Sequence, residues 1–391
     1  MSTSRTSKKR PAYSTYGAQA VRAHSATRLE VHLGYALKPG RQTGAALDNP
    51  LFELLAAVAD GGSIRHAARL LSTSYRYVWD ALKKWEKLLG EPLVTWSQGQ
   101  RAKPTEFARR LLWLERRARA RMQPQLEALR WDLDAAIAAA RDESQPLLTV
   151  RASHDIALSV LQRHASQGDF HIDLAFAGSI GALRALNQRQ CLVAGFHVPA
   201  LRAAPVFARA LKPVLKPRAH KLIACCRRTQ GLMLRADLKE RVRTFRDVVE
   251  SRLRFVNRQA GSGTRLLVEH LLREHSIAPA SWPGYADHVE NTHVAVGLCV
   301  ASGVADVGIG IEAAALQFGL HFIPLVEEHY FLACMNDTLE HPAVRRMRDV
   351  LAGPSWARIL ESLPGYRPAD DPGSVASVAQ IAAGGASTRV G

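Results

Sequence analysis

The chain has 391 residues, of which 47% are hydrophobic and 22% charged, the usual range for proteins that bury a core. This length predicts roughly two or three domains. The absence of any run of about 18 apolar residues argues against a transmembrane helix. The segment Met1–Arg10 is polar and basic, so we expect no secretory signal. The five scattered cysteines lack CxxC spacing, which argues against disulfides and a zinc site and favours the cytoplasm.

Basic residues outnumber acidic ones, and the surplus is unevenly distributed. Lys and Arg total 52 against 35 Asp and Glu, giving a formal charge of +17. Residues 1–140 hold 23 basic and 12 acidic residues, net +11, and residues 141–391 hold 29 and 23, net +6. Such a surplus favours a polyanionic partner, double-stranded DNA before an acidic membrane. An Arg-rich proteome is the alternative explanation for part of it.

Changes of composition along the chain predict its domain organisation. The basic, Ser-rich start and the Ala- and Gly-rich end are typical of disordered segments. We predict a disordered arm (1–27), a winged helix-turn-helix domain (28–104), a linker helix (105–145), a two-lobed α/β domain (146–370) and a disordered tail (371–391).

The first folded domain shows helical periodicity in three short segments. We predict helices over Leu51–Ala59, Ile64–Leu71 and Tyr75–Leu89, because Gly and Ser residues punctuate the pattern between them. A short β-like segment, Pro92–Trp96, follows. Three helices followed by a two-stranded hairpin form a winged helix-turn-helix, whose third helix enters the major groove of DNA.

Polar and aromatic side chains of this third helix and its surroundings are the candidate DNA contacts. Ser and Thr in the turn can donate to phosphates, and basic residues can reach base edges or the next groove. The alternative is that Tyr75 and Trp79 belong to the core and that the lysines only solvate a helix face. The predicted DNA-binding residues are Ser72, Thr73, Ser74, Tyr75, Arg76, Trp79, Lys83, Lys84, Arg101 and Lys103.

The next segment predicts one long helix over Thr105–Ala140, with a stripe of leucines including Leu126 and Leu129. A long helix with one apolar stripe needs a partner, so we expect it to form a homodimer or homotetramer. Pro124 is expected to break or kink it.

The C-terminal half alternates strand and helix patterns, which predicts mostly parallel sheets in two lobes. Four polar clusters fall at strand-to-helix junctions. They are Ser153-His154-Asp155, Gly178-Ser179, Arg258 with Gly261–Arg265, and Asn291-Thr292-His293. Free amides at helix starts favour anions, so converging clusters predict an oxyanion site. The alternative is that each Ser or Thr is only a helix cap.

Two stretches carry a family resemblance. GGSIRHAARLLSTSYRYVWDALKKWEKLLGEPLV resembles the DNA-binding domain of LysR-type regulators, and its SYRYVWDAL portion resembles the ModE-type branch. NRQAGSGTRLLVEHLL and HVAVGLCVASGVADVGIG resemble periplasmic-binding-protein-like effector domains, while GSIGALRALNQRQCLVAGFHVP is similar to molybdate-type binding proteins. Lys103–Glu106 departs from the family's Leu-Thr-x-x-Gly stretch. The resemblance implies an α+β multidomain regulator that senses a small ligand and alters promoter binding.

It also implies ligand-binding residues. Ser153 and Ser179 would be loop donors, and Arg258 and Arg265 would neutralise charge or pair with acids of the opposite lobe. The whole predicted set is Ser153, His154, Ser179, His197, Arg258, Ser262, Gly263, Thr264, Arg265, Thr292, His293 and Tyr330. The expected effector is molybdate, tungstate or a small carboxylate such as formate, with no covalent cofactor.

Other functional classes have weaker support. Gly308–Ala313 lacks the context of a dinucleotide site, Gly261–Thr264 lacks the GK[ST] ending of a phosphate loop, and Glu269–His275 lacks zinc-protease spacing. We therefore predict no catalytic or metal-binding residues. Two alternatives stay open: a small-molecule enzyme with an added DNA-binding domain, and an architectural DNA-binding protein without a ligand.

Overall fold

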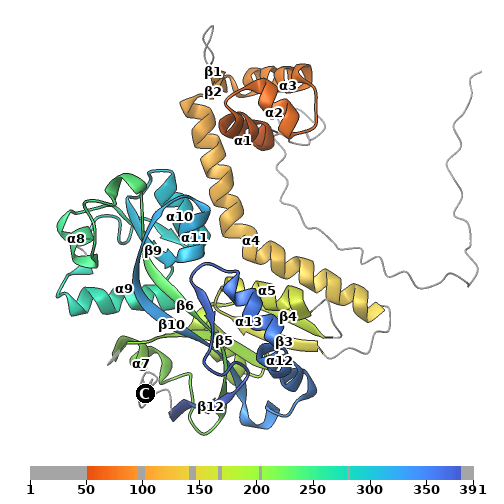
Figure 1. Ribbon diagram of the computed structural model, residues 1–391, viewed down its shortest axis with the longest axis vertical. Helices are drawn as coiled ribbons and strands as arrows, with labels where there is room; N and C mark the ends of the chain where they lie inside the picture. The colour runs from red at the N-terminus through yellow and green to blue at the C-terminus, as the bar shows by residue number, and fades with distance from the viewer. Residues whose placement is uncertain are drawn as a thin grey trace, which may run out of the picture.

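The computed structural model describes residues 51–95, 102–140, 147–165, 170–201, 205–279 and 282–379 (Figure 1). The predicted arm (1–27) and Arg101 lie outside these ranges. No helix in the described ranges is long and apolar enough to cross a membrane.

The N-terminal domain has the predicted winged helix-turn-helix order. Ser63 and Ser74 begin the second and third helices, and each hydroxyl accepts a hydrogen bond of 3.1 Å from the amide three residues on. Gly90 ends the third helix in the left-handed conformation, at φ 73°. The elements are α1 (Leu51–Gly61), α2 (Ile64–Leu70), α3 (Tyr75–Leu89), β1 (Val94–Thr95) and β2 (Lys103–Pro104).

The linker is one continuous helix, α4 (Glu106–Ala140), with Pro124 inside it. Figure 1 shows that α4 changes direction part-way along, which is the expected effect of an internal proline. Pro124 therefore bends the helix but does not end it.

The C-terminal domain is built on a mixed sheet. Its strands follow the order β4-β3-β5-β10-β6-β9-β7-β8, and β11 and β12 also pair with β6. They are β3 (Leu147–Ala152), β4 (His171–Phe176), β5 (Val193–Pro199), β6 (His220–Leu234), β7 (Phe255–Arg258), β8 (Val289–Glu290), β9 (Val307–Ile311), β10 (His321–Met335), β11 (Tyr366–Pro368) and β12 (Val375–Ser377).

Strands β6 and β10 correct the expectation of mostly parallel sheets. Each is 15 residues long, and they pair antiparallel with each other along that length. The parallel pairs are confined to β3 with β4 and β5 on one side and β7 with β8 and β9 on the other. The sequence predicts only part of each long strand, because polar residues interrupt the alternation of apolar residues along it.

The helices divide into two groups at opposite ends of the β6–β10 pair (Figure 1). One group is α8 (Phe245–Glu250), α9 (Gly263–Glu274), α10 (His293–Ala301) and α11 (Glu312–Gln317). The other is α5 (Ile156–Ala165), α6 (Gly178–Asn187), α12 (Pro342–Ala352) and α13 (Pro354–Glu361). Helix α7 (Pro205–Leu211) contacts α9, and its Phe207 packs into the apolar cluster of the first group. The two groups correspond to the expected lobes.

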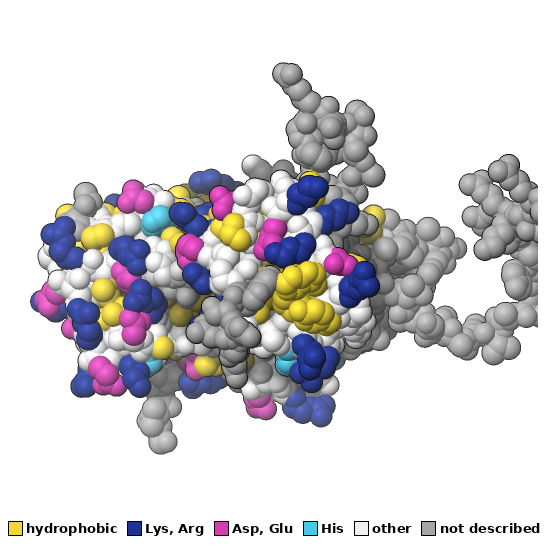
Figure 2. Space-filling model, turned by 90° about the horizontal axis from the view of Figure 1, so that it is seen from above, with side chains coloured by type: hydrophobic (Ala, Val, Ile, Leu, Met, Phe, Trp, Pro, Cys, Tyr) yellow, Lys and Arg dark blue, Asp and Glu magenta, His cyan; other side chains and the backbone are white. Residues whose placement is uncertain are grey.

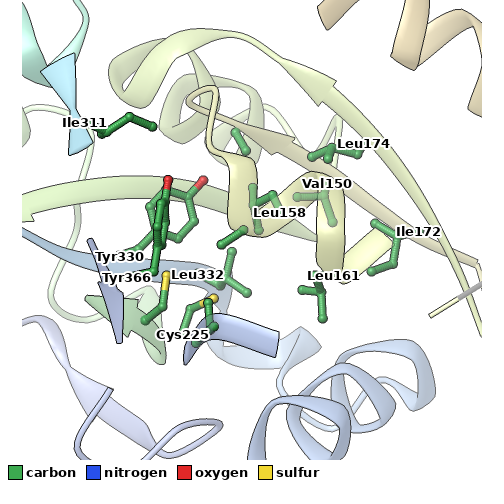
Figure 3. Packing of buried hydrophobic residues seen from close by; sticks show 14 of the residues in the cluster. Val150, Leu158, Leu161, Ile172, Leu174, Cys225, Ile311, Tyr330, Leu332 and Tyr366 are labelled. Atoms are coloured by element: carbon green, nitrogen blue, oxygen red, sulfur yellow. The ribbon is translucent and has the colours of Figure 1, made fainter. Parts of the chain in front are cut away.

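The largest apolar cluster contains Trp356 and Tyr330, which are almost completely buried. Figure 3 shows Tyr330 and Tyr366 side by side, with both hydroxyls pointing the same way out of the apolar side chains. These hydroxyls bond to the loop that follows β3: Tyr330 donates to the Ser153 carbonyl at 3.2 Å and Tyr366 to Asp155 at 3.2 Å. The core thus fixes one wall of the site described below.

The predicted disordered tail (371–391) is corrected for residues 371–379. Val375–Ser377 pairs antiparallel with β6, and Val378 is buried against a neighbouring apolar cluster. Composition alone did not predict this strand, because its one valine, Val375, is surrounded by Ala, Gly and Ser. Residues 380–391 lie outside the described ranges.

Candidate effector cavity and DNA-binding surface

A cavity of about 270 Å³ lies where the starts of α5, α6, α9 and α10 meet. Each helix follows a strand, so the polar residues at these junctions face a common space. The lining residues are Pro124, Gln125, Ser153, His154, Phe176, Ala177, Gly178, His197, Arg228, Arg258, Gln259, Ser262, Gly263, Thr264, Asn291 and His293.

Several buried donors at this cavity lack partners. Nε and Nη1 of Arg258 have no hydrogen-bond partner among the described residues, although this side chain is only 5% exposed. Its Nη2 donates to the Asn291 carbonyl at 2.9 Å. The hydroxyl of Ser179 is also buried without a partner. Because an unpaired buried donor is costly, these groups mark a place for an acceptor that comes from outside the chain.

The charges around the cavity leave it positive. Burial, followed by repulsion from Arg228, lowers the pKa of Arg258 to about 9, so Arg258 is still a cation at neutral pH. Burial, followed by Arg258, lowers the pKa of His154 to about 4 and holds that of His293 well below its usual value. Both histidines are therefore neutral, and an anion would relieve the unfavourable burial of Arg258.

A second polar network lies behind the cavity. Asp155 Oδ2 accepts from Arg228 at 2.7 Å and contacts His197 Nε2 at 3.1 Å. His197 Nδ1 contacts the Ser153 hydroxyl at 2.8 Å. Arg228 also donates to Glu328 at 2.9 Å. Burial alone would raise the pKa of Asp155, but the charge of Arg228, the contact with His197 and the bond from the Ala157 amide together outweigh it and hold that pKa far below the usual range.

Ser153, His197 and Asp155 are linked in the order of a catalytic triad, which the sequence analysis did not foresee. Burial and the charge of Arg228 lower the pKa of His197. An imidazolium would have to form beside Arg228, which is unfavourable. The arrangement therefore disfavours His197 as a general base and fits a role in holding Ser153.

The third helix of the N-terminal domain presents one buried and one exposed face. Val78, Leu82 and Trp85 are buried in the domain core. Arg76 is exposed and lies 3.7 Å from Asp80, while Lys83 lies over the Trp79 ring at 5.3 Å. Basic and aromatic side chains on one exposed helix face are the features required for reading a DNA groove.

The other predicted DNA contacts lie around this helix. Trp79 and Thr73 are half-buried. Trp79 also packs against the domain core, so the alternative that it is a core residue applies to it in part. Figure 2 looks onto the molecule from the end that carries this domain and shows basic side chains around hydrophobic ones. The exposed members of the set are Ser72, Ser74, Tyr75, Arg76, Lys83, Lys84 and Lys103.

Residues 51–109 match the model of the bacterial regulatory helix-turn-helix protein, lysR family. Residues 161–352 match the PBP superfamily domain. The chain is a LysR-type transcriptional regulator with a PBP-like domain. Together the two matches cover the three-helix region and most of the domain that holds the cavity.

This LysR-type regulator is similar to several known proteins. It is 27% identical over 216 residues to the uncharacterized protein YvgK of Bacillus subtilis, covering 55% of this chain and 69% of that protein. It is 33% identical over 90 residues to the molybdenum transport protein ModE of Azotobacter vinelandii, covering 22% and 33%. Among solved structures, a cysteine-to-serine mutant of Corynebacterium glutamicum OxyR with bound hydrogen peroxide has a TM-score of 0.42 and 15% identity, covering 77% and 90%.

In this LysR-type regulator the linker helix packs directly against the effector domain. Arg117 and Arg121 of α4 both bind the fully buried Glu290, and the Arg117 Nε–Glu290 Oε1 distance is 2.7 Å. Burial would raise the pKa of Glu290, but its bonds to these two arginines lower it instead. A buried carboxylate held by two arginines ties the helix to β8.

Pro124 makes a further docking contact possible. Proline has no amide hydrogen, so the carbonyl of Ala120, four residues earlier, receives no bond from it within the helix. The Thr292 hydroxyl donates to this carbonyl at 3.2 Å, and the Asn291 side-chain amide donates to the Arg121 carbonyl at 3.1 Å. Pro124 and Gln125 also line the cavity. The linker helix is thus one of its walls.

The structure places the predicted ligand residues in three positions. Ser179 is buried beside the cavity: a Cβ on Gly263 would lie 3.8 Å from its hydroxyl oxygen. Arg265, Thr292 and Tyr330 do not line it. The members that do are Ser153, His154, His197, Arg258, Ser262, Gly263, Thr264 and His293.

The three residues outside the cavity lining have other partners in the structure, and a ligand role for them stays a prediction. Arg265 binds Glu269 at 3.2 Å and lies over the Tyr285 ring at 4.2 Å. Thr292 caps α10 and holds α4. Tyr330 is buried beneath Ser153. Ser262, although it lines the cavity, has its hydroxyl occupied as the cap of α9, as the alternative interpretation proposed.

Several lining residues were not predicted from the sequence: Pro124, Gln125, Phe176, Ala177, Arg228 and Gln259. Arg228 belongs to the long strand β6 and Pro124 to the predicted linker helix, and neither position carries a local sign of a ligand site. Gln259 follows Arg258 directly, so its proximity in sequence to a predicted cluster was the signal that could have found it. Gly178 and Asn291 line the cavity and belong to the clusters predicted from the sequence. Within the described ranges no group of three His, Cys, Asp or Glu residues could hold a metal ion.

Proposed function

We propose that this regulator senses a small oxyanion or carboxylate in the cavity and that the anion alters its binding to promoter DNA. The observation that carries the proposal is the pair of unpartnered buried donors, Arg258 and Ser179. The start of α9 adds first-turn amides, which have no acceptors within a helix and favour negative charge. The volume of about 270 Å³ fits a ligand of few atoms.

Isothermal titration of the full chain against molybdate, tungstate, sulfate, phosphate, formate and acetate tests this proposal. Ser179→Ala removes a donor to the anion, so we expect at least about a tenfold loss of affinity. DNA binding by this variant should persist, because the N-terminal domain is unchanged. The proposal fails if none of these anions binds, or if Ser179→Ala binds as tightly as the parent. The similarity to a molybdenum transport protein makes molybdate a reasonable first probe.

We propose that the linker helix transmits occupancy to the DNA-binding domain. Pro124 and Gln125 line the cavity, and the same helix continues to Glu106 beside the β1–β2 hairpin. An anion that favours one docked position of α4 would shift the equilibrium between positions and thus the spacing of two DNA-binding domains in an oligomer.

The coupling is tested with Glu290→Gln, which weakens the attachment of α4 through Arg117 and Arg121. Glu269→Gln is the control, since Glu269 pairs with Arg265 away from the cavity lining. We expect Glu290→Gln to bind the anion but to lose its effect on the affinity for a selected DNA fragment, measured by fluorescence anisotropy. An unchanged anion effect in Glu290→Gln would contradict transmission through this contact.

We also propose that α4 supports assembly into a homodimer or homotetramer. Its exposed apolar residues lie on the surface of the helix away from the domain cores. They are Leu114, Met122, Leu129 and Leu133. An exposed apolar stripe of this length is typical of a helix that pairs with a second copy.

A further inference from the structure

We propose that the ligand is a small anion that carries its own hydroxyl group, and that Ser153 accepts a hydrogen bond from this hydroxyl and so determines specificity. The inference rests on the proposed anion binding. It follows from the direction of the hydrogen bonds behind the cavity.

The starting point is Asp155, which is surrounded by donors. Its carboxylate accepts from Arg228 at 2.7 Å, from the Tyr366 hydroxyl at 3.2 Å and from the Ala157 amide at 2.7 Å. An ionised carboxylate can only accept hydrogen bonds. His197 Nε2, at 3.1 Å from the same carboxylate, must therefore carry a hydrogen.

The other ring nitrogen of His197 then sets the state of Ser153. Burial and Arg228 lower the pKa of His197, so the ring is neutral and Nδ1 has a lone pair. The Ser153 hydroxyl, 2.8 Å away, donates its hydrogen to this lone pair. Only the oxygen lone pairs of Ser153 remain for a ligand. Its predicted role as an anion donor is thereby reversed.

The cavity thus offers donors and an acceptor together. Arg258 and Ser179 provide donors for charged oxygens, while Ser153 provides an acceptor that repels them. Leaving such an acceptor without a donor is unfavourable. Hydrogen phosphate and hydroxycarboxylates such as glycolate can pair with both the donors and the acceptor. Molybdate, tungstate, sulfate and formate are fully deprotonated at neutral pH and have no hydroxyl, so they can pair only with the donors.

Two matched pairs of anions test the inference on the full chain by isothermal titration at neutral pH. Glycolate is compared with acetate, and phosphate with sulfate, because the members of each pair differ mainly in a hydroxyl donor. We expect the hydroxyl-bearing member of at least one pair to bind about tenfold more tightly than its counterpart.

Two serine variants assign the preference. Ser153→Ala should abolish it, because His197 Nδ1 lies 2.8 Å behind the lost oxygen, and another unpaired acceptor of the lining, Asn291 Oδ1, lies just before α10 in the other lobe. Ser179→Ala is the matched control: it removes a donor for the charged oxygens, so it should weaken both members of the pair and leave their ratio unchanged. Thermal unfolding of both variants checks that they fold like the parent.

The outcomes separate this inference from the proposed function. If acetate and sulfate both bind as tightly as their hydroxyl-bearing counterparts, or if Ser153→Ala keeps the preference, the role of Ser153 is overturned while anion binding stands. If no anion of either pair binds, this inference fails, and the proposed function fails with it only if molybdate, tungstate and formate do not bind either. A preference that Ser153→Ala removes and Ser179→Ala preserves supports the assignment.

Discussion

Replacing Arg258 with methionine should make the unliganded protein more stable while it abolishes anion binding. Arg258 is 5% exposed, and two of its nitrogens have no partner among the described residues. Methionine is unbranched and apolar, so it can occupy much of the same volume without a charge. This result would mean that the charge of Arg258 serves to bind the anion and does not stabilise the fold.

The pKa shift gives the size of the effect. The pKa of Arg258 falls from 12.5 to about 9, which at about 1.4 kcal/mol per unit is roughly 5 kcal/mol against the cation in the folded state. Arg258→Met also loses the hydrogen bond to the Asn291 carbonyl, worth about 1.5–3 kcal/mol. Some packing is lost as well. We therefore expect a net gain of about 1–2 kcal/mol in the free energy of unfolding.

Urea unfolding of the full chain measures this gain, and Arg228→Met is the matched control. Arg228 is equally buried, but Asp155 and Glu328 pair with it at 2.7 and 2.8 Å. Removing it leaves two buried carboxylates without their partner, so we expect a loss of about 3–5 kcal/mol. If Arg258→Met is destabilised as much as Arg228→Met, or still binds the anion with the parent's affinity, the charge of Arg258 is structural and the reasoning is wrong.

Three further predictions concern other parts of the molecule. Arg76→Ala and Lys83→Ala should each weaken specific DNA binding by about 1–3 kcal/mol if they reach base edges, and unchanged anisotropy titrations at fixed salt would refute this placement. Leu129→Asp should dissociate the oligomer, since Leu129 is 49% exposed on α4, and sedimentation like that of the parent would place the interface elsewhere. The pKa of His154 is lowered from 6.5 to about 4 in the folded protein, so the free energy of unfolding should fall by roughly 3 kcal/mol as the pH falls from above 6.5 to about 4. Urea unfolding at both pH values measures this loss, and His154→Gln should make the free energy of unfolding depend less on pH.

The N-terminal domain was predictable because its signals are local. Caps at Ser63 and Ser74 and the spacing of Val78, Leu82 and Trp85 determine where helices start and which face is buried. These features need only the neighbouring few residues. The predicted third helix therefore agrees with α3 at both ends.

The site was predictable only in part, because its network depends on pairing over long separations. Arg228 and Glu328 face each other across β6 and β10. Neither strand segment carries a local sign that its charged residue is buried and paired. Ser153, a predicted ligand residue, lines the cavity, but the direction of its hydrogen bond depends on His197 and Asp155 together.

Because of Pro124, α4 can bind to and separate from the effector domain at this point without breaking a backbone hydrogen bond of the helix. The carbonyl of Ala120 has no amide from residue 124 to accept, so its bond to Thr292 competes with no backbone bond of the helix. Water can replace Thr292 at that carbonyl when the two parts separate. The helix can therefore change position without unwinding a turn, and amide hydrogen exchange along α4 should remain equally slow in both positions. For the two positions that we propose for α4, we therefore expect this contact to differ mainly in hydration.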